Sequence, residues 1–151
     1  MTIIEVINQI DALKPNNYSQ EDKIKWLSTL DGIIKREIID THEGADKEQA
    51  ITDYMKTNEV SYEEAKEHIE ATRNDIMFQG YDESTNLDTV LLVAAPYDDI
   101  YVKWLEVQID YANADYGKYA NSMIMYNNAY ATFYSWYNRN YMPKGKKFKY
   151  F

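Results

Sequence analysis

Residues 97–141 read YDDIYVKWLEVQIDYANADYGKYANSMIMYNNAYATFYSWYNRNY. Apolar and aromatic side chains recur along this stretch at steps of three or four residues. That spacing places them on one face of an α-helix, so we predict a long C-terminal helical region. The face consists of Tyr101, Leu105, Ile109, Ala112, Tyr116, Tyr119, Met123, Tyr126, Tyr130, Phe133 and Tyr137.

The same stretch carries more aromatic side chains than the core of one small monomer can bury. Tyrosine packs well in a core, and tyrosine and tryptophan are also favoured at protein–protein contacts. For Tyr126 and Tyr130 both interpretations fit the pattern. We predict that part of this surface is buried only in an assembly. The candidate interface residues are Trp104, Tyr111, Tyr126, Tyr130, Tyr134, Trp136, Tyr137 and Tyr141.

The segment Asn113–Gly117 is the weakest point of the helical pattern, because Asn, Asp and Gly favour turns. The helical period nevertheless continues through it without a shift of phase. The sequence therefore allows either one long helix or two. We expect Asp98 or Asp99 to begin this region and Met142-Pro143 to end it.

Two amphipathic helices are predicted at the N-terminus. Thr2 and Glu5 form a capping-box pattern ahead of the first helix, which Pro15 ends. A second helix is expected to begin after Ser19 and to end at Gly44, a residue type that favours helix C-caps.

Residues 45–74 are rich in charged side chains and poor in large aliphatic ones, which predicts a peripheral, solvated helical hairpin with its turn at 57–60. Residues 75–96 lack helical periodicity, and we predict an irregular segment in which Ile76–Phe78 and Val90–Val93 are short extended pieces. The fold is therefore predicted to be an all-α bundle of four to six helices, in one domain over residues 1–143.

Composition limits the classes of function. The chain has 151 residues, no cysteine and a formal net charge of −9. Disulfides, cysteine-based zinc sites and thiol catalysis are excluded. The negative charge disfavours general attraction to nucleic acid and to anionic membranes. No secretory signal or membrane-spanning run is visible, so we expect a cytoplasmic protein with no membrane partner.

Positive charge gathers after the last predicted helix. We expect residues 144–151 to form a flexible tail that mixes basic and aromatic side chains. Docking onto an acidic neighbouring subunit and contact with single-stranded nucleic acid are the two further interpretations. The candidate partner-contacting residues are Lys144, Lys146, Lys147, Phe148, Lys149, Tyr150 and Phe151.

No recognised catalytic or metal-binding motif is present in the sequence. His42 and His68 lie outside known metal spacings, and we expect both at the surface. Residues 82–88 alternate oxygen-bearing side chains like a calcium loop, but Leu87 and Val93 stand where an EF-hand needs Gly and Glu. We predict an ordinary turn there, and no catalytic residue, metal, cofactor or small-molecule substrate.

Several motifs resemble small structural proteins from the morphogenesis modules of tailed phages and prophages, over about three quarters of the chain. Residues 45–74 look like an insertion relative to that pattern. The motifs are Leu13–Asn16, the stretch from Trp26-Leu27 to Glu43, Gly80–Glu83, Leu87–Val93, Pro96–Asp99, Trp104-Leu105, Gln108–Asn113, Tyr126–Tyr130, Tyr137–Arg139 and Met142-Pro143.

The resemblance implies a head–tail connector or head-completion protein. Such a protein is mostly helical, carries no active site and assembles as a homo-oligomeric ring with portal and other neck proteins. It would be found in the host cytoplasm during assembly and then in the virion neck. The alternatives are a soluble helical binding module whose tail contacts nucleic acid without specific recognition, and an enzyme that uses paired carboxylates.

Overall fold

The computed structural model describes residues 1–42, 45–73 and 78–143, with the side chains of 1–42, 50–69 and 78–143. Over these ranges the chain is all-α, as predicted, and forms no β-strand. The helices are α1 (Ile3–Leu13), α2 (Gln20–Ile34), the π-helical turn η1 (Lys35–Ile39), α3 (Ala45–Asn58), α4 (Tyr62–Arg73), α5 (Ile100–Ala112) and α6 (Tyr116–Asn140).

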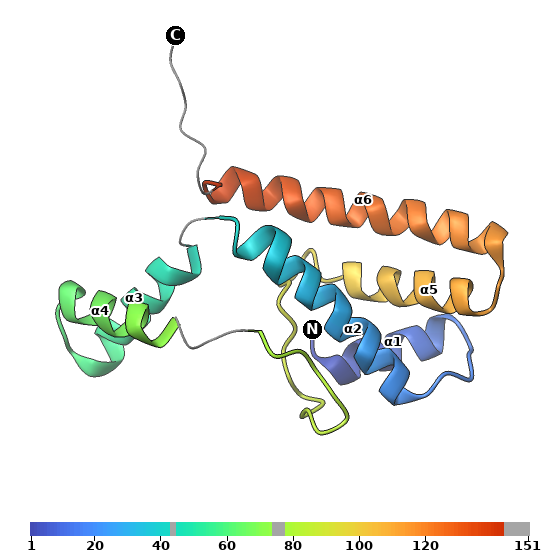
Figure 1. Ribbon diagram of the computed structural model, residues 1–151, viewed down its shortest axis with the longest axis horizontal. Helices are drawn as coiled ribbons and strands as arrows, with labels where there is room; N and C mark the ends of the chain where they lie inside the picture. The colour runs from blue at the N-terminus through green and yellow to red at the C-terminus, as the bar shows by residue number, and fades with distance from the viewer. Residues whose placement is uncertain (43–44, 74–77, 144–151) are drawn as a thin grey trace, which may run out of the picture.

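The C-terminal region consists of two antiparallel helices, α5 and α6, that pack along each other (Figure 1). Ala114 takes a positive φ of 54° in the turn between them, and Asp115 caps α6 by accepting a hydrogen bond from the Lys118 amide at 3.3 Å. The sequence left one helix or two open, and the structure has two. The predicted stripe is therefore two facing stripes, and Tyr116, beside the turn, is 68 % exposed.

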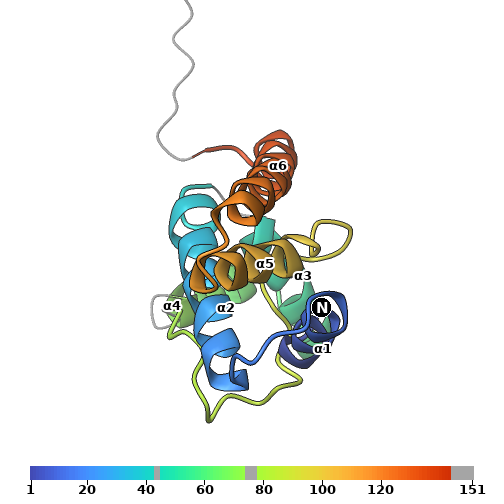
Figure 2. The same cartoon turned by 90° about the vertical axis from the view of Figure 1, so that its right-hand side faces the viewer.

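Helix α5 is central to the fold. It contacts α6 on one side and α1 and α2 on the other (Figure 2). Tyr101, Leu105 and Ile109 of α5 are fully buried, where they meet α1, α2 and α6. The remaining core residues are Ile3, Val6, Ile7, Ile10, Ile24, Leu27, Leu30, Ile34, Ile38, Leu91, Val93, Ile100, Val107, Tyr126, Phe133 and Tyr137.

The predicted N-terminal boundaries of the first two helices are confirmed. Thr2 and Glu5 form both hydrogen bonds of the capping box, and Ser19 accepts from the Asp22 amide at 3.1 Å. Helix α2 ends at Ile34 and continues as η1, and the predicted end at Gly44 lies outside the described residues. Within α2, a Cβ added at Gly32 would lie 3.7 Å from the Phe78 ring, an ordinary van der Waals distance, so the packing there does not require glycine.

Helices α3 and α4 form the predicted hairpin, which projects from one end of the bundle (Figure 1). The turn between them contains Glu59 at a positive φ of 52°, and Ser61 caps α4 by accepting from the Glu64 amide. Ile51 and Ala65 are fully buried, so the hairpin has a small apolar contact of its own. Its status as an insertion stays a prediction.

The irregular segment predicted at 75–96 is described over residues 78–96, where the predicted extended piece Val90–Val93 does not form a β-strand. Its backbone bonds instead to the start of α1: the Ile3 and Ile4 amides donate to the carbonyls of Thr89 and Leu87, at 3.1 and 3.0 Å. Val90 forms one isolated bridge with Thr2. The first amides of α1 have no partner within the helix, and they bond to carbonyls of this segment. These carbonyls are therefore not available to pair with a second strand. Ile76 and Met77 lie outside the described residues.

Candidate functional site

The structure divides the eight candidate interface residues into three groups. Tyr126 and Tyr137 lie in the core, with 7 % and 8 % of their surface exposed. Tyr111 and Tyr134 are exposed, at 62 % and 41 %. The half-buried group is Trp104, Tyr130, Trp136 and Tyr141. The exposed pair can therefore meet a partner without any change in the fold.

A ladder of aromatic rings runs along α6 from the core to solvent. Tyr126 packs on Trp104 with ring centroids 4.9 Å apart, and Tyr130 follows at 6.1 Å from Tyr126. Tyr134 stacks on Tyr130 at 6.4 Å, with the two planes only 9° apart. The inner rings thus hold the exposed Tyr134 ring in a defined orientation.

Glu37 of η1 anchors this ladder. The Tyr130 hydroxyl donates to Glu37 Oε2 at 3.0 Å. Burial, together with the negative charge of Glu37, raises the pKa of Tyr126 to about 12. Burial and the hydrogen bond to Glu37 raise the pKa of Tyr130 in the same direction. The raised pKa values keep both hydroxyls protonated to a higher pH than an exposed tyrosine.

A second exposed aromatic group lies at the α5–α6 turn. Tyr111 and Tyr116 are 62 % and 68 % exposed, and the half-buried Tyr119 packs on Tyr111 with ring centroids 5.5 Å apart. We call Tyr111, Tyr116 and Tyr119 the aromatic tip. Sequence reasoning placed Tyr116 and Tyr119 on the core stripe, because periodicity does not reveal that the turn separates the stripe into two helices.

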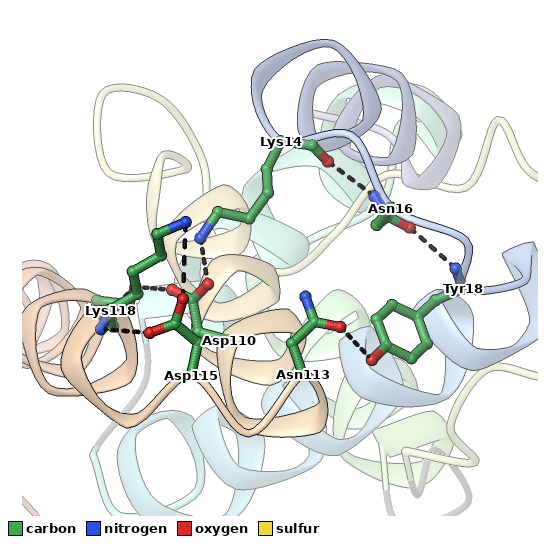
Figure 3. Close-up of polar contacts among 8 residues, drawn as sticks. Lys14, Asn16, Tyr18, Asp110, Asn113, Asp115 and Lys118 are labelled. Carbon is green, nitrogen blue, oxygen red and sulfur yellow. Dashed lines mark hydrogen bonds and ion pairs between the residues drawn. The ribbon is translucent and has the colours of Figure 1, made fainter.

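Polar contacts from the α1–α2 connection brace the aromatic tip (Figure 3). Asp110, only 2 % exposed, forms an ion pair with Lys14 and accepts a hydrogen bond from Ser122 of α6. The Tyr18 hydroxyl donates to Asn113 Oδ1 at 2.7 Å. These contacts join the α1–α2 connection to the end of α5 and the start of the α5–α6 turn, beside the exposed tyrosines.

The other buried carboxylate, Asp31 of α2, organises the irregular segment. It is fully buried and accepts from the hydroxyls of Tyr81 and Tyr101, each at 2.6 Å. The Leu92 amide donates to it at 3.2 Å. Burial raises the pKa of Asp31 despite these hydrogen bonds. Asp31 therefore ties α2, α5 and residues 81–92 together.

The expectation that both histidines lie at the surface is wrong for His42, which is 4 % exposed. Its Nε2 lies 2.5 Å from Asn138 Oδ1 and its Nδ1 lies 2.6 Å from the Ile38 carbonyl. The ring also packs edge-on against Tyr137 at 4.9 Å. The end of α6 covers His42, a tertiary contact that local acidic sequence does not reveal. His68 is exposed, as predicted, and stacks on Tyr54 at 4.2 Å.

The loop that superficially resembles a calcium site is a turn held by Asp82. Its carboxylate accepts from the Ser84 amide at 2.8 Å and from the Ser84 hydroxyl at 2.5 Å. These hydrogen bonds hold the pKa of Asp82 below its usual range. One Asp82 oxygen thus bonds within the loop, which forms a turn as predicted.

The described residues contain neither a metal-binding cluster nor a membrane-spanning helix. No cluster of three or more His, Cys, Asp or Glu side chains is placed there to hold a metal ion. Among the described helices, none has the length and apolarity required to cross a membrane. The candidate tail, residues 144–151, lies outside the described residues.

Comparison of the chain with protein-family models, with curated proteins and with solved structures finds no match.

Proposed function

We propose that this protein is a non-enzymatic structural protein of a tailed phage or prophage, a head–tail connector subunit that assembles on the portal ring. The observation that carries the proposal is the braced aromatic tip. Tyr111 and Tyr116 are exposed beside a turn that is tied to the α1–α2 connection, and large exposed tyrosines suit a protein–protein contact. The motif resemblance supplies the class of partner.

The buried carboxylates support a structural role over the enzyme alternative. Asp31 accepts three hydrogen bonds, and Asp110 is engaged by Lys14 and Ser122. Every buried side-chain N or O atom within the described residues has a hydrogen-bond partner. The carboxylates that are most shielded from water thus stabilise the fold and face no open site.

The proposal also includes location and partners. The protein would exist in the host cytoplasm during assembly and in the virion neck afterwards, in a homo-oligomeric ring. In such a ring one patch of each subunit meets a different patch of its neighbour. The acidic body and the basic tail provide unlike surfaces of this kind, since the chain carries net charge −9 with four lysines among its last eight residues.

The test is reconstitution with the portal protein of the phage or prophage genome that encodes this chain. We expect native mass spectrometry and negative-stain images to show portal rings carrying a full circle of this protein. Portal rings that stay bare at an excess of this protein would contradict the proposal. Binding to single-stranded DNA that is lost on deleting 144–151 and that weakens with salt would favour the binding-module alternative.

A further inference from the structure

The outward side of α6 forms a surface with a regular spacing. Figure 1 shows α6 along one edge of the bundle, packed on α5. The α6 outer face, as we call it, consists of Asn121, Ile124, Asn128, Ala131 and Ser135, all of them exposed. They follow one another at alternating steps of three and four. This 3.5-residue spacing is the one with which two helices pack along each other.

The α6 outer face is also unusual in charge. Between Lys118 and Arg139 the helix contains no charged residue, although 27 % of the whole chain is charged. Protein surfaces commonly carry about 25–35 % charged residues, whereas the centres of protein interfaces are depleted of charge. In its lack of charge, the α6 outer face therefore matches a contact surface better than a permanently solvated one.

The two halves of the face differ in shape. In the first half, Ile124 and the neighbouring Met125 are large apolar side chains with 58 % and 51 % of their surfaces exposed. In the second half there is a shallow groove of about 420 Å³, lined by Asn128, Ala131, Thr132, Ser135 and Arg139. Large exposed apolar side chains and a hollow thus lie one to two turns apart on the same helix.

We infer that a second copy of this chain covers the α6 outer face, with the two α6 helices antiparallel and crossing near Asn128. In that arrangement Ile124 and Met125 of each copy meet the groove of the other, so one contact is made twice about a two-fold axis. A parallel pair would place these apolar side chains against each other and leave both grooves empty. The shape of the face is therefore complementary to itself only in the antiparallel sense.

The distribution of charge favours contact between two copies of this chain at the α6 outer face. Two copies that each carry net charge −9 repel each other over most of their surfaces, and an uncharged face is where they can approach at least cost. Lys118 of one copy and Arg139 of the other would lie near each other at the rim, where both are exposed and screened by salt. Added salt should therefore strengthen the association, the opposite of a contact between basic tail and acidic surface.

The contact is small. From Asn121 to Ser135 the seam is about 21 Å long at 1.5 Å per residue. A pair of helices of this length buries less than the roughly 1,200 Å² of a standard interface, so we expect a weak dimer that forms as concentration rises. This dimer is distinct from the proposed ring and uses a different surface from the aromatic tip.

The test uses the absence of cysteine from the chain, which makes any introduced thiol unique. In the antiparallel pair Asn121 of one copy lies opposite Ser135 of the other. We expect an equimolar mixture of Asn121→Cys and Ser135→Cys chains to form disulfide-linked dimers under mild oxidation at high concentration. Each variant alone should form them at least tenfold more slowly. Leu13→Cys, at a 61 % exposed position on α1, gives the background rate of random collision.

Three results would overturn the inference. The first is a mixture that cross-links no faster than Leu13→Cys. The second is Asn121→Cys alone cross-linking as fast as the mixture, which would indicate a parallel pair. The third is sedimentation that stays monomeric at all concentrations, as expected if another segment or another protein covers the face. Sedimentation should also show that Ile124→Lys abolishes the dimer while the matched Leu13→Lys leaves it intact. Loss of this dimer would leave the portal reconstitution unaffected, so the two proposals fail separately.

Discussion

At the scale of single residues, the structure depends on a few side chains that sequence patterns do not single out. Asp31 lies mid-helix at a position that periodicity would assign to an apolar residue, yet three donors from two elements converge on it. A buried carboxylate is tolerated when it is fully hydrogen-bonded. Its role is to hold residues 81–92 against the bundle, together with the apolar contacts of Leu91 and Leu87.

Replacing Asp31 by Ala should lower the free energy of unfolding by roughly 2–3 kcal/mol, because buried donors lose their acceptor. Chemical denaturation measures this, with the exposed Asp88→Ala as a control that should change stability by less than about 0.5 kcal/mol. A loss for Asp31→Ala as small as that of the control would contradict the role assigned to Asp31.

Comparison of the parent protein with the Asp31→Ala variant also tests the pKa of Asp31. Because burial raises this pKa in the folded protein, the folded state binds a proton before the unfolded state does as pH falls. The parent should therefore gain stability relative to Asp31→Ala as pH falls through the folded pKa towards about 4, the value of an unfolded carboxyl. A stability difference that shrinks over this range would show the opposite shift.

Two tyrosines of the same stretch should respond differently to truncation. Tyr126→Ala removes a core ring and should cost about 3 kcal/mol or more of unfolding free energy. Tyr111→Ala removes an exposed ring and should cost less than about 1 kcal/mol. Thermal unfolding of both variants measures the contrast. Equal losses would mean that the division into core and exposed tyrosines is wrong.

At the scale of elements, caps and periodicity could be read from the sequence, whereas tertiary contacts could not. The Thr2–Glu5 capping box and the hairpin turn near Glu59 are local, so the residues alone predicted them. The sequence did not decide whether a turn separates α5 from α6, because the apolar residues keep the same spacing across Asn113–Gly117. Only the positive φ of Ala114 and the contacts of Asn113 and Asp110 with the α1–α2 connection decide between one helix and two.

The candidate site, too, could be predicted from the sequence only where it depends on local pattern. The sequence identified the aromatic stretch, but not which rings are exposed, since exposure depends on which helix packs on which. It predicted Tyr111 and Tyr134 for an interface and missed Tyr116, which lies beside the turn. The burial of His42 depends on the end of α6, far away in sequence.

The α3–α4 hairpin should be removable. Its buried residues Ile51 and Ala65 do not belong to the main core cluster, so deleting 45–74 and joining the ends with a short Gly-Ser linker should leave a folded bundle. Circular dichroism and cooperative thermal unfolding of the shortened chain measure this. A shortened chain that is insoluble or unfolds without cooperativity would show that the hairpin is part of the bundle.

At the scale of the whole molecule, the protein is an acidic helical body that presents separate surfaces for separate contacts. The aromatic tip lies at one end of the molecule and the hairpin projects from the other (Figure 1). The α6 outer face lies along the side between them. The proposed ring contact and the inferred dimer contact therefore occupy different surfaces and can be changed separately.

Portal binding by a Tyr111→Ser/Tyr116→Ser double variant tests the central claim most directly. Both side chains are more than half exposed, so the variant should melt within about 3 °C of the parent. The account predicts that this folded protein no longer adds to portal rings in native mass spectrometry, while an Ile124→Lys variant still does. A double variant that fills portal rings as completely as the parent would contradict the claim that the aromatic tip carries assembly.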